Sequence, residues 1–463
     1  MTIRRTICRT QMLLNDGGPS WPTSRKRSRC SVRAEATWSL LHISSRTMCR
    51  RNGWKNLLNC VSKTEITKRE SFHMNQNKET MTSRERVLKT LNFETPDRVP
   101  IDLGGNQTGI HKNAYMNLVK YFGLNEELEI MDAVQQLAQP SEAVLERFHV
   151  DTRYIRAGAG EGYDGTIKQN TRDGKLWHDL KDEFGVVWSM PDHNPLYMDI
   201  SRHPLANATI DDLKDYPWPK GNDPVRFAGL RERALTLKKE TPYAVVSGIA
   251  GVVYEYCWYL RGLEDWFCDL VTDGEFCEAL IDQTCKFWMD YFEGFLNEVG
   301  DLVDVIMIGD DLAGQDGPLF NPEIYHSIVK PRHKKLAQYI RSRTQAKIWY
   351  HTCGNCRAYI PELKDNGVDI LNPVQTSAKN MDAAELKAEW GGKMVFWGGG
   401  CDSQHVLPTG TPETVYENTR SNVEIFKQGS GYVFNNIHNI QGEVSPQNIV
   451  AMYDAAYENG FYN

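Results

Sequence analysis

Three residues in the second half of the chain, His351, Cys353 and Cys401, carry the side chains of a zinc site. One imidazole and two thiolates suit zinc, and three protein ligands leave the open fourth position that a catalytic zinc ion requires. His351 and Cys353 are one residue apart, so both side chains can face the same side of an extended strand end. Cys401 follows three glycines, which let the backbone approach a site closely. The alternative is that the cysteines are small buried residues and that His351 is a hydrogen-bonded core imidazole.

A fourth candidate, Cys356, forms a Cys-x-x-Cys pair with Cys353. This pair could be a redox dithiol, or the four side chains could close a structural zinc site. A thioredoxin-type fold is far smaller than this chain, which disfavours the redox interpretation. Cys356 could also simply pack on the first turn of the following helix.

Further polar residues follow apolar segments of the chain. Asp310 and Asp311 are candidates for a fourth metal ligand or for acid–base work, although Asp311 could instead cap a turn. The remaining residues are predicted to contact a substrate from their positions alone: Gln375, Asn436, His438 and His111.

The elements that must position these side chains are short apolar runs that alternate with helical patterns. Such alternation predicts βα units and a parallel sheet, and eight runs predict a closed (β/α)8 barrel, with an open doubly wound sheet as the alternative. In a parallel barrel, function lies at the carboxyl ends of the strands, where most of the candidates fall. The eight runs are 99–103, 150–157, 243–249, 303–308, 347–350, 368–371, 394–397 and 432–434.

Helix starts are marked by capping residues. Thr82 with Glu85 three residues later predicts a capping box, and three Asn, Thr or Ser residues precede a proline that would occupy the first helical position. These three pairs are Asn321-Pro322, Thr411-Pro412 and Ser445-Pro446. Residues 160–220 break the rhythm with turn signals and short β-like pieces, which predicts an insertion of hairpins between early barrel strands.

The charge is distributed unevenly along the 463 residues. Residues 1–73 hold 15 Lys/Arg against 4 Asp/Glu, whereas the rest holds 38 against 56. The basic segment has the composition of a transit peptide, or it is upstream sequence before a true start at Met74 or Met81, or, as a third option, it is a nucleic-acid-binding arm. We therefore expect a disordered leader over 1–73 and the barrel domain over 74–463.

The composition of the barrel domain excludes several functions. Its acidic balance disfavours nucleic acid as a partner, and no apolar run is long enough for a membrane helix. The sparse cysteines predict a reduced, cytoplasmic setting. No glycine-rich dinucleotide fingerprint follows a strand, and no phosphate-binding loop or serine nucleophile elbow is present.

Several stretches resemble the uroporphyrinogen-decarboxylase superfamily, over roughly residues 82–462. They are 309–312, 315–319, Pro322, Lys330-Pro331, 351–354, 367–375, 397–402 and 438–441, with Pro446 and Asn448. The resemblance implies a (β/α)8 barrel with one of two chemistries. One branch removes carboxylates from uroporphyrinogen without a metal, and the other contains zinc-dependent methyltransferases that work with a corrinoid protein.

The resemblance is closer to the methyltransferase branch. Its members are similar in a His-x-Cys followed much later by Cys, which His351, Cys353 and Cys401 match. The decarboxylases carry an arginine pair near the N-terminus that grips acidic side chains, whereas residues 102–111 hold no arginine. The resemblance thus implies zinc in this chain and a cobamide carried by a separate corrinoid protein, since no corrinoid-binding motif is visible.

The sequence therefore predicts a zinc-dependent methyltransferase that moves a methyl group between a corrinoid protein and a small-molecule donor or a thiol or other acceptor. Two alternatives are a uroporphyrinogen decarboxylase-type carboxy-lyase and a non-catalytic barrel that only binds a ligand.

Overall fold

A computed structural model describes residues 79–193 and 195–462 of the chain. The predicted leader, 1–73, lies outside the described residues. None of the described helices is long and apolar enough to cross a membrane.

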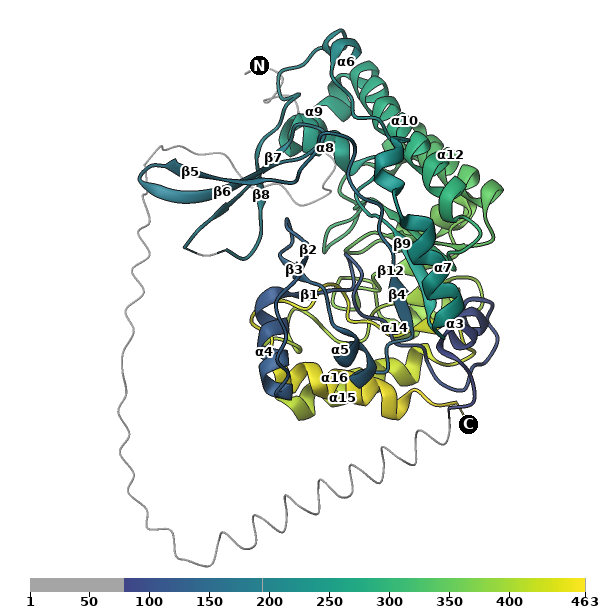
Figure 1. The fold of residues 1–463 in the computed structure, drawn as a ribbon. Helices are drawn as coiled ribbons and strands as arrows, with labels where there is room; N and C mark the ends of the chain where they lie inside the picture. The colour runs from purple at the N-terminus through teal and green to yellow at the C-terminus, as the bar shows by residue number, and fades with distance from the viewer. Residues whose placement is uncertain (1–78, 194, 463) are drawn as a thin grey trace, which may run out of the picture. The chain divides into compact units, whose positions relative to one another are not determined.

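The centre of the fold is a sheet of seven parallel strands, each hydrogen-bonded to the next one along the chain (Figure 1). Ile101 forms parallel bridges to Val150 and to Phe434, which adjoin the two opposite edges of this sheet. The segment around Ile101 thus closes the sheet, and the (β/α)8 barrel predicted from eight apolar runs is confirmed. The seven strands are β4 (Thr152–Tyr154), β9 (Ala244–Gly248), β10 (Val305–Gly309), β11 (Lys347–His351), β12 (Ile370–Asn372), β13 (Val395–Trp397) and β14 (Tyr432–Val433).

The interior of the barrel is filled by alternate side chains of these strands, because successive residues of a strand point to opposite faces. Trp349 and Trp397 stack inside with ring centroids 4.7 Å apart. Helix α3 (Ser83–Leu91) begins with the predicted Thr82–Glu85 capping box, and its Val87 belongs to the same apolar cluster as the two tryptophans.

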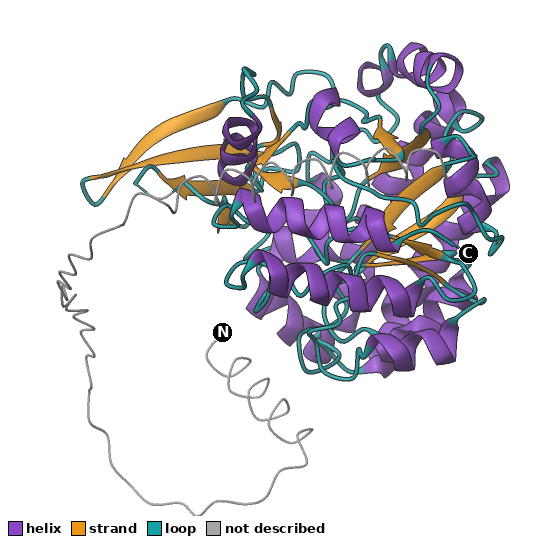
Figure 2. Cartoon of the chain, turned by 90° about the horizontal axis from the view of Figure 1, so that it is seen from below, coloured by secondary structure: helices purple, strands orange, loops and turns teal. Residues whose placement is uncertain are grey.

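Helices follow most of the strands and cover the outside of the barrel (Figure 2). The predicted caps are confirmed, since the side chains of Asn321, Thr411 and Ser445 each accept a hydrogen bond from the first turn of a helix. The helices are α4 (Lys112–Phe122), α5 (Glu142–Arg147), α6 (Asp212–Asp215), α7 (Leu230–Glu240), α8 (Glu255–Arg261), α9 (Leu263–Thr272), α10 (Gly274–Val299), α11 (Pro322–Ile324), α12 (Lys330–Arg343), α13 (Ile360–Asn366), α14 (Ala383–Trp390), α15 (Pro412–Phe426) and α16 (Pro446–Asn459), with short helical turns η1 (Pro224–Phe227), η2 (Tyr325–Val329) and η3 (Arg357–Tyr359).

Two small antiparallel sheets interrupt the alternation early in the chain. One, with strand order β1-β3-β2, follows the Ile101 segment, and the other, with order β5-β6-β7-β8, lies between β4 and β9 as the predicted hairpin insertion. In the insertion, Phe184 contacts the rings of Tyr256 on α8 and Phe287 on α10, which fixes the four-stranded sheet to the barrel helices. The strands are β1 (Ile110–His111), β2 (Ile130–Asp132), β3 (Leu137–Ala138), β5 (Ile167–Arg172), β6 (Lys175–Lys181), β7 (Val187–Pro191) and β8 (Asp199–Arg202).

A buried charge network joins the first two barrel strands at their amino-terminal side. The Asp151 carboxylate accepts hydrogen bonds from Arg86 at 2.6 Å, from Arg98 at 2.7 Å and from the Ile101 N–H at 2.8 Å. Although burial opposes it, the two guanidinium groups lower the pKa of Asp151, so this carboxylate stays charged inside the protein. The network therefore connects the segment around Ile101, which closes the barrel, to strand β4.

Candidate active site

The predicted site residues other than His111 lie at or after the ends of the central strands. His351 is the last residue of β11, and the strand register sets it beside Gly309 of β10 and Asn372 of β12. It lies on the same face of its strand as Trp349, so its ring stands at the barrel mouth, one level above the Trp349–Trp397 stack.

The His351 imidazole is held in one orientation by Asn372. The Asn372 side-chain N–H₂ donates to the Trp397 carbonyl at 2.8 Å, which turns Asn372 Oδ1 toward His351 Nδ1 at 2.6 Å. Because Oδ1 can only accept, Nδ1 must carry the proton and Nε2 keeps its lone pair. Burial lowers the pKa of His351 to about 4, so the ring is neutral at physiological pH, as a metal ligand must be.

His351 Nε2 lies in a group with two other potential ligand atoms. It is 3.5 Å from Cys353 Sγ, and the ligand atoms of His351, Cys353 and His438 all lie within 4.8 Å of one another. Burial and the neighbouring His351 lower the pKa of His438 to about 4. Among the described residues this is the one such group of three or more His, Cys, Asp or Glu residues.

The third predicted zinc ligand, Cys401, lies outside that group. Its Sγ is 4.0 Å from the Asp402 carbonyl, and its side chain also interacts with Thr419 on α15. Burial raises the pKa of this thiol to about 12, so it is neutral in this position. The structure thus groups His351 and Cys353 with His438, which the sequence predicts only as a substrate contact, and it leaves Cys401 outside this group.

Two acidic side chains, Asp311 and the buried Glu255, lie close to Cys353. The Cys353 N–H donates to Asp311 at 2.7 Å, and Glu255, at the first position of α8, accepts from the Asp311 N–H. Burial raises the pKa of both carboxyls, and burial together with the charge on Asp311 raises the pKa of the Cys353 thiol. No lysine or arginine of the described chain pairs with Glu255 or Asp311, so the cluster lacks positive charge. A divalent cation bound by the adjacent imidazole and thiol groups would supply it, which is why this donor set fits a metal ion such as zinc.

Asp310 is used differently from Asp311. Its carboxylate accepts hydrogen bonds from the Val253 and Glu255 N–H groups, at 3.0 and 2.8 Å, and lies 2.8 Å from His333 Nε2. It therefore caps the start of α8 and holds Glu255 next to the site, and these contacts occupy both of its oxygens.

Gln375 and Asn436 support the loops of the mouth. Gln375 accepts from the Gly354 N–H at 2.8 Å, which fixes the turn that follows Cys353. Asn436 donates to the His438 carbonyl at 3.1 Å, and its buried Oδ1 has no hydrogen-bond partner within the described chain. That oxygen could accept a hydrogen bond from a substrate.

Both ring nitrogens of His111 are engaged within the fold. Nδ1 accepts from the Asn113 N–H and thereby caps α4, and Nε2 lies 3.0 Å from the Leu196 carbonyl. The ring thus links α4 to the insertion, and neither nitrogen is left for the substrate contact predicted from the sequence.

Two site residues escaped the sequence analysis as chemical candidates. Asn372 is visible there only as one more polar residue after a strand, and only the register of β11 against β12 reveals that it orients His351. Glu255 follows a strand by several residues and belongs to no motif; it reaches the site because Asp310 caps its helix.

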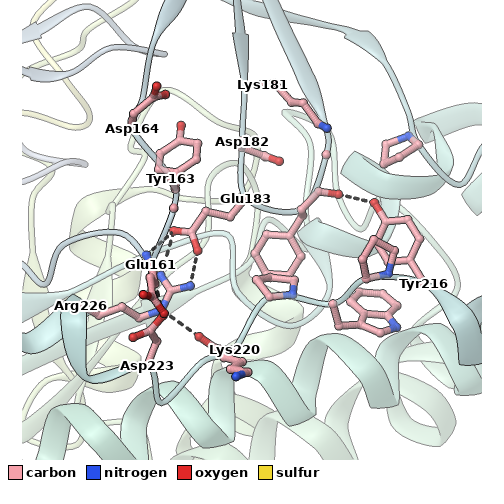
Figure 3. A pocket seen from close by; sticks show the side chains of 18 of the residues that line it. Glu161, Tyr163, Asp164, Lys181, Asp182, Glu183, Tyr216, Lys220, Asp223 and Arg226 are labelled. Atoms are coloured by element: carbon pink, nitrogen blue, oxygen red, sulfur yellow. Dashed lines mark hydrogen bonds and ion pairs between the residues drawn. The ribbon is translucent and has the colours of Figure 1, made fainter.

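A cavity of about 1040 Å³ lies in the insertion and not at the strand ends (Figure 3). At one side the Arg226 guanidinium meets the Glu183 carboxylate, and at the other Tyr216 donates to the Phe184 carbonyl. Asp182 also lines it and accepts from the Trp188 indole N–H at 3.1 Å. These contacts lie within the fold and bring together no set of three metal ligands, so we place the chemistry at the barrel mouth.

This chain is similar to known proteins in sequence and in fold. The family model described as uroporphyrinogen decarboxylase (URO-D) matches residues 183–459. A methylated-thiol–coenzyme M methyltransferase of Methanosarcina mazei is 25% identical over 251 residues, which span 53% of this chain and only 60% of that protein. A solved structure of a methyltransferase from Methanosarcina mazei superposes with a TM-score of 0.52 over 81% of this chain and 98% of its own, at 17% identity. At 17% identity, the similarity to this solved structure shows a shared fold.

Proposed function

Because this chain belongs to the uroporphyrinogen decarboxylase (URO-D) family, and because His351, Cys353 and His438 converge at its barrel mouth, we propose that it is a zinc-dependent methyltransferase. It would move a methyl group between a corrinoid carried by a partner protein and a small molecule, either a thiol acceptor or a methyl donor. Its similarity to the thiol methyltransferase of Methanosarcina mazei supports this branch of the family.

The observation that carries the proposal is the orientation of His351. Its Nδ1–H is bound by Asn372 and its Nε2 lies 3.5 Å from Cys353 Sγ, so both ligand atoms are directed to one place. A metal-binding histidine commonly donates its other N–H to an oxygen of the protein, which fixes the tautomer and strengthens the ligand.

A bound zinc ion would act as a Lewis acid, keeping a thiol acceptor as thiolate or polarising a donor oxygen. His351 and Cys353 would hold it, with His438 or Cys401 as third ligand. Cys401 lies on the loop after β13 and would have to leave Thr419, whereas His438 already belongs to the group. Asp311 and Glu255, whose carboxyl pKa values are raised by burial, would either bind the cation or carry the proton released by the thiol.

The chemical step is a nucleophilic substitution at the methyl carbon. In the thiol direction the acceptor sulfur would form the new S–C bond while the methyl group leaves the partner's corrinoid, which would keep the electron pair of the broken bond. The chain's own residues position the sulfur, and Asn436 Oδ1, which lacks a partner within the described chain, could hold the acceptor.

Elemental analysis of the purified full chain tests the metal site. We expect about one zinc per chain in the wild type and little in Cys353→Ser. Cys356→Ser is the matched control, because this thiol is buried just beyond Cys353 but is not part of the ligand group. His438→Ala and Cys401→Ser, measured side by side, identify the third ligand by which of them loses the metal.

Transfer is tested with methylcob(III)alamin and a thiol, by the change in cobalamin absorbance. Wild type should demethylate the corrinoid and Cys353→Ser should not. If the wild type holds no zinc and decarboxylates acidic substrates in the presence of a chelator, the methyltransferase proposal is wrong. The protein would then be a decarboxylase.

A further inference from the structure

The hairpin insertion carries basic side chains that the proposed methyl transfer does not use. Three of them come from three different strands of the sheet β5-β6-β7-β8. They are Lys168 of β5, Lys181 of β6 and Arg202 of β8, here called the basic row. All three are exposed, in a barrel domain that holds more acidic than basic residues. The basic row is therefore a local positive patch on an acidic protein.

The strand register places the basic row on one face of the sheet. Lys181 lies opposite Val187 of β7, and Val187 lies opposite Arg202 of β8, so these two cations are separated by one strand. Lys168 lies opposite Asp179, which precedes Lys181 by two residues and shares its face. Neighbouring strands are about 4.8 Å apart, so the Cα atoms of Lys181 and Arg202 are separated by roughly 10 Å. Their long side chains can thus reach one anion placed between them.

The basic row lies where two cavities adjoin. One is the cavity of about 1040 Å³ in Figure 3, and the other, of about 680 Å³, lies over the sheet. Each member of the basic row lines both cavities. Ligand pockets commonly measure about 300–1,000 Å³, so this space accommodates a molecule much larger than an inorganic ion.

Most carboxylates of the larger cavity have partners within the fold. Glu183 forms an ion pair with Arg226, and exposed Glu161 lies beside that arginine (Figure 3). The other three accept hydrogen bonds from N–H groups, and they are Asp164, Asp182 and Asp223.

The members of the basic row have no such partners. Within residues 79–193 and 195–462, no carboxylate forms an ion pair with Lys168, Lys181 or Arg202. Arg172 lies on the same face of β5 and is different, because it is paired with Asp179. The sheet thus neutralises one of its cations itself and leaves the basic row available to an anion from solution.

Aromatic side chains adjoin the basic row. Tyr216 and Trp218 line the larger cavity, and their rings meet edge to face with centroids 4.9 Å apart. A Cβ atom on Gly185 would lie 3.0 Å from the Tyr216 hydroxyl and 3.8 Å from Lys181 Cε. The Lys181 stem therefore passes close to Tyr216, as Figure 3 also shows. A ligand held by the basic row has an aromatic wall next to it.

We propose that the basic row binds the phosphate group of a ligand of nucleotide size, with the flat ring of that ligand against Tyr216 and Trp218. A phosphate monoester carries up to two negative charges and three acceptor oxygens, so it can contact several cations at once. The planar guanidinium of Arg202 suits phosphate oxygens, and Lys181 adds a point charge. Aromatic side chains stack on flat rings of any base. None of these residues belongs to the group around His351, so the site is separate from the proposed metal centre.

Calorimetric titration of the full chain at low salt tests the inference. The probes are ADP, inorganic pyrophosphate and adenosine, which carry both features, the phosphates alone and the ring alone. ADP should bind roughly 10-fold or more tightly than adenosine, since hydrogen bonds to charged groups are strong, and its affinity should fall as salt screens the exposed cations. No binding of ADP or pyrophosphate at millimolar concentration, or equal affinities for ADP and adenosine, would overturn the inference. Pyrophosphate binding as tightly as ADP would refute the contact with the aromatic wall.

Variants then assign the binding to the basic row. Lys181→Gln and Arg202→Gln should each weaken ADP binding roughly 3- to 10-fold, between the effects of an exposed ion pair and a buried charged hydrogen bond, and leave adenosine unchanged. Lys175→Gln is the matched control, because Lys175 is exposed on the same face of β6 but lines neither cavity. Both tested side chains are exposed, so the variants should melt at the wild-type temperature. If both variants bind ADP as tightly as the wild type, or if Lys175→Gln weakens binding equally, the basic row is not the site. Zinc takes no part in these titrations, so their outcome is independent of the proposed function.

Discussion

The substitution Asn372→Leu should weaken metal binding without removing any metal ligand. Within the described chain, Asn372 Oδ1 is the hydrogen-bond partner of His351 Nδ1, at 2.6 Å, and the Asn372 side chain in turn donates to the Trp397 carbonyl at 2.8 Å. Leucine has nearly the same size but no acceptor. The His351 ring would then lose the contact that keeps its proton on Nδ1 and its Nε2 directed at Cys353 Sγ.

The magnitude follows from two terms. Loss of an oxygen that orients a histidine ligand lowers metal affinity about 10- to 100-fold, equivalent to about 1.4–2.8 kcal/mol. The buried Nδ1–H and Trp397 carbonyl would also lose their partners, at a cost to folding of about 1–3 kcal/mol each. The variant should thus bind zinc more weakly and melt at a lower temperature, with the ligands still in place.

Competition with a chromophoric chelator measures the zinc affinity of wild type, Asn372→Leu and a control, Asn366→Leu. Asn366 lies on α13, away from the strand ends, and is also buried. Its side chain donates to the Tyr325 hydroxyl at 3.2 Å. The control should lose stability but keep its affinity for zinc. If Asn372→Leu is folded and binds zinc within twofold of the wild type, the reasoning about His351 is refuted.

Three other perturbations follow from the same structure. Asp151→Asn should destabilise the protein by about 3–5 kcal/mol in chemical denaturation, because two buried guanidinium groups lose their counter-ion, whereas Asp454→Asn at a partly exposed ion pair should cost less than about 1 kcal/mol. In Gly309→Ala the added Cβ would lie 2.3 Å from the His351 carbonyl oxygen and would push the end of β11 away. The variant should therefore contain less zinc, and its folded state should be destabilised by about 1–3 kcal/mol. A normal zinc content would contradict this prediction. Burial raises the pKa of Asp182 to about 6, so its carboxyl group binds a proton more tightly in the folded state than in the unfolded state. Its contribution to the free energy of unfolding should therefore be complete below about pH 4 and should be lost as the pH rises through 6. Melting temperatures at pH 5 and pH 7 should differ less in Asp182→Asn than in the wild type, and an unchanged difference would contradict the prediction.

Most of the fold could be predicted because its signals are local. The strands β9 to β14 are short apolar runs that need no distant information, and the capping residues Asn321, Thr411 and Ser445 act within one helical turn. The closing strand around Ile101 was also predictable as an apolar run, although its two partners lie far apart in the sequence.

The site could be predicted only in part, because its chemistry depends on distant contacts. The spacing of His351 and Cys353 determines that they share a strand end, whereas the side-chain position of Cys401 depends on its packing against Thr419 of α15. The sequence predicts His438 only as a substrate contact, and it is the curvature of the closed barrel that brings its ring to His351. The role of a residue could be predicted where it depends on residues nearby in the sequence, and could not be predicted where it depends on side chains that pack against it from distant segments.

The closure of the barrel at Ile101 has a consequence for how the protein is made. The Asp102 carbonyl next to that bridge accepts from the Asn435 side chain, 333 residues later. At a synthesis rate of about 5–20 residues per second, the first strand would wait roughly 20–70 seconds for its partner. Until then the edge beside Ile101 and the edge of the strand made last expose unpaired backbone groups, and such edges favour aggregation. A nascent chain that stops short of β14 would leave the barrel open, so we expect C-terminal truncations to burden chaperones more than their small loss of mass suggests.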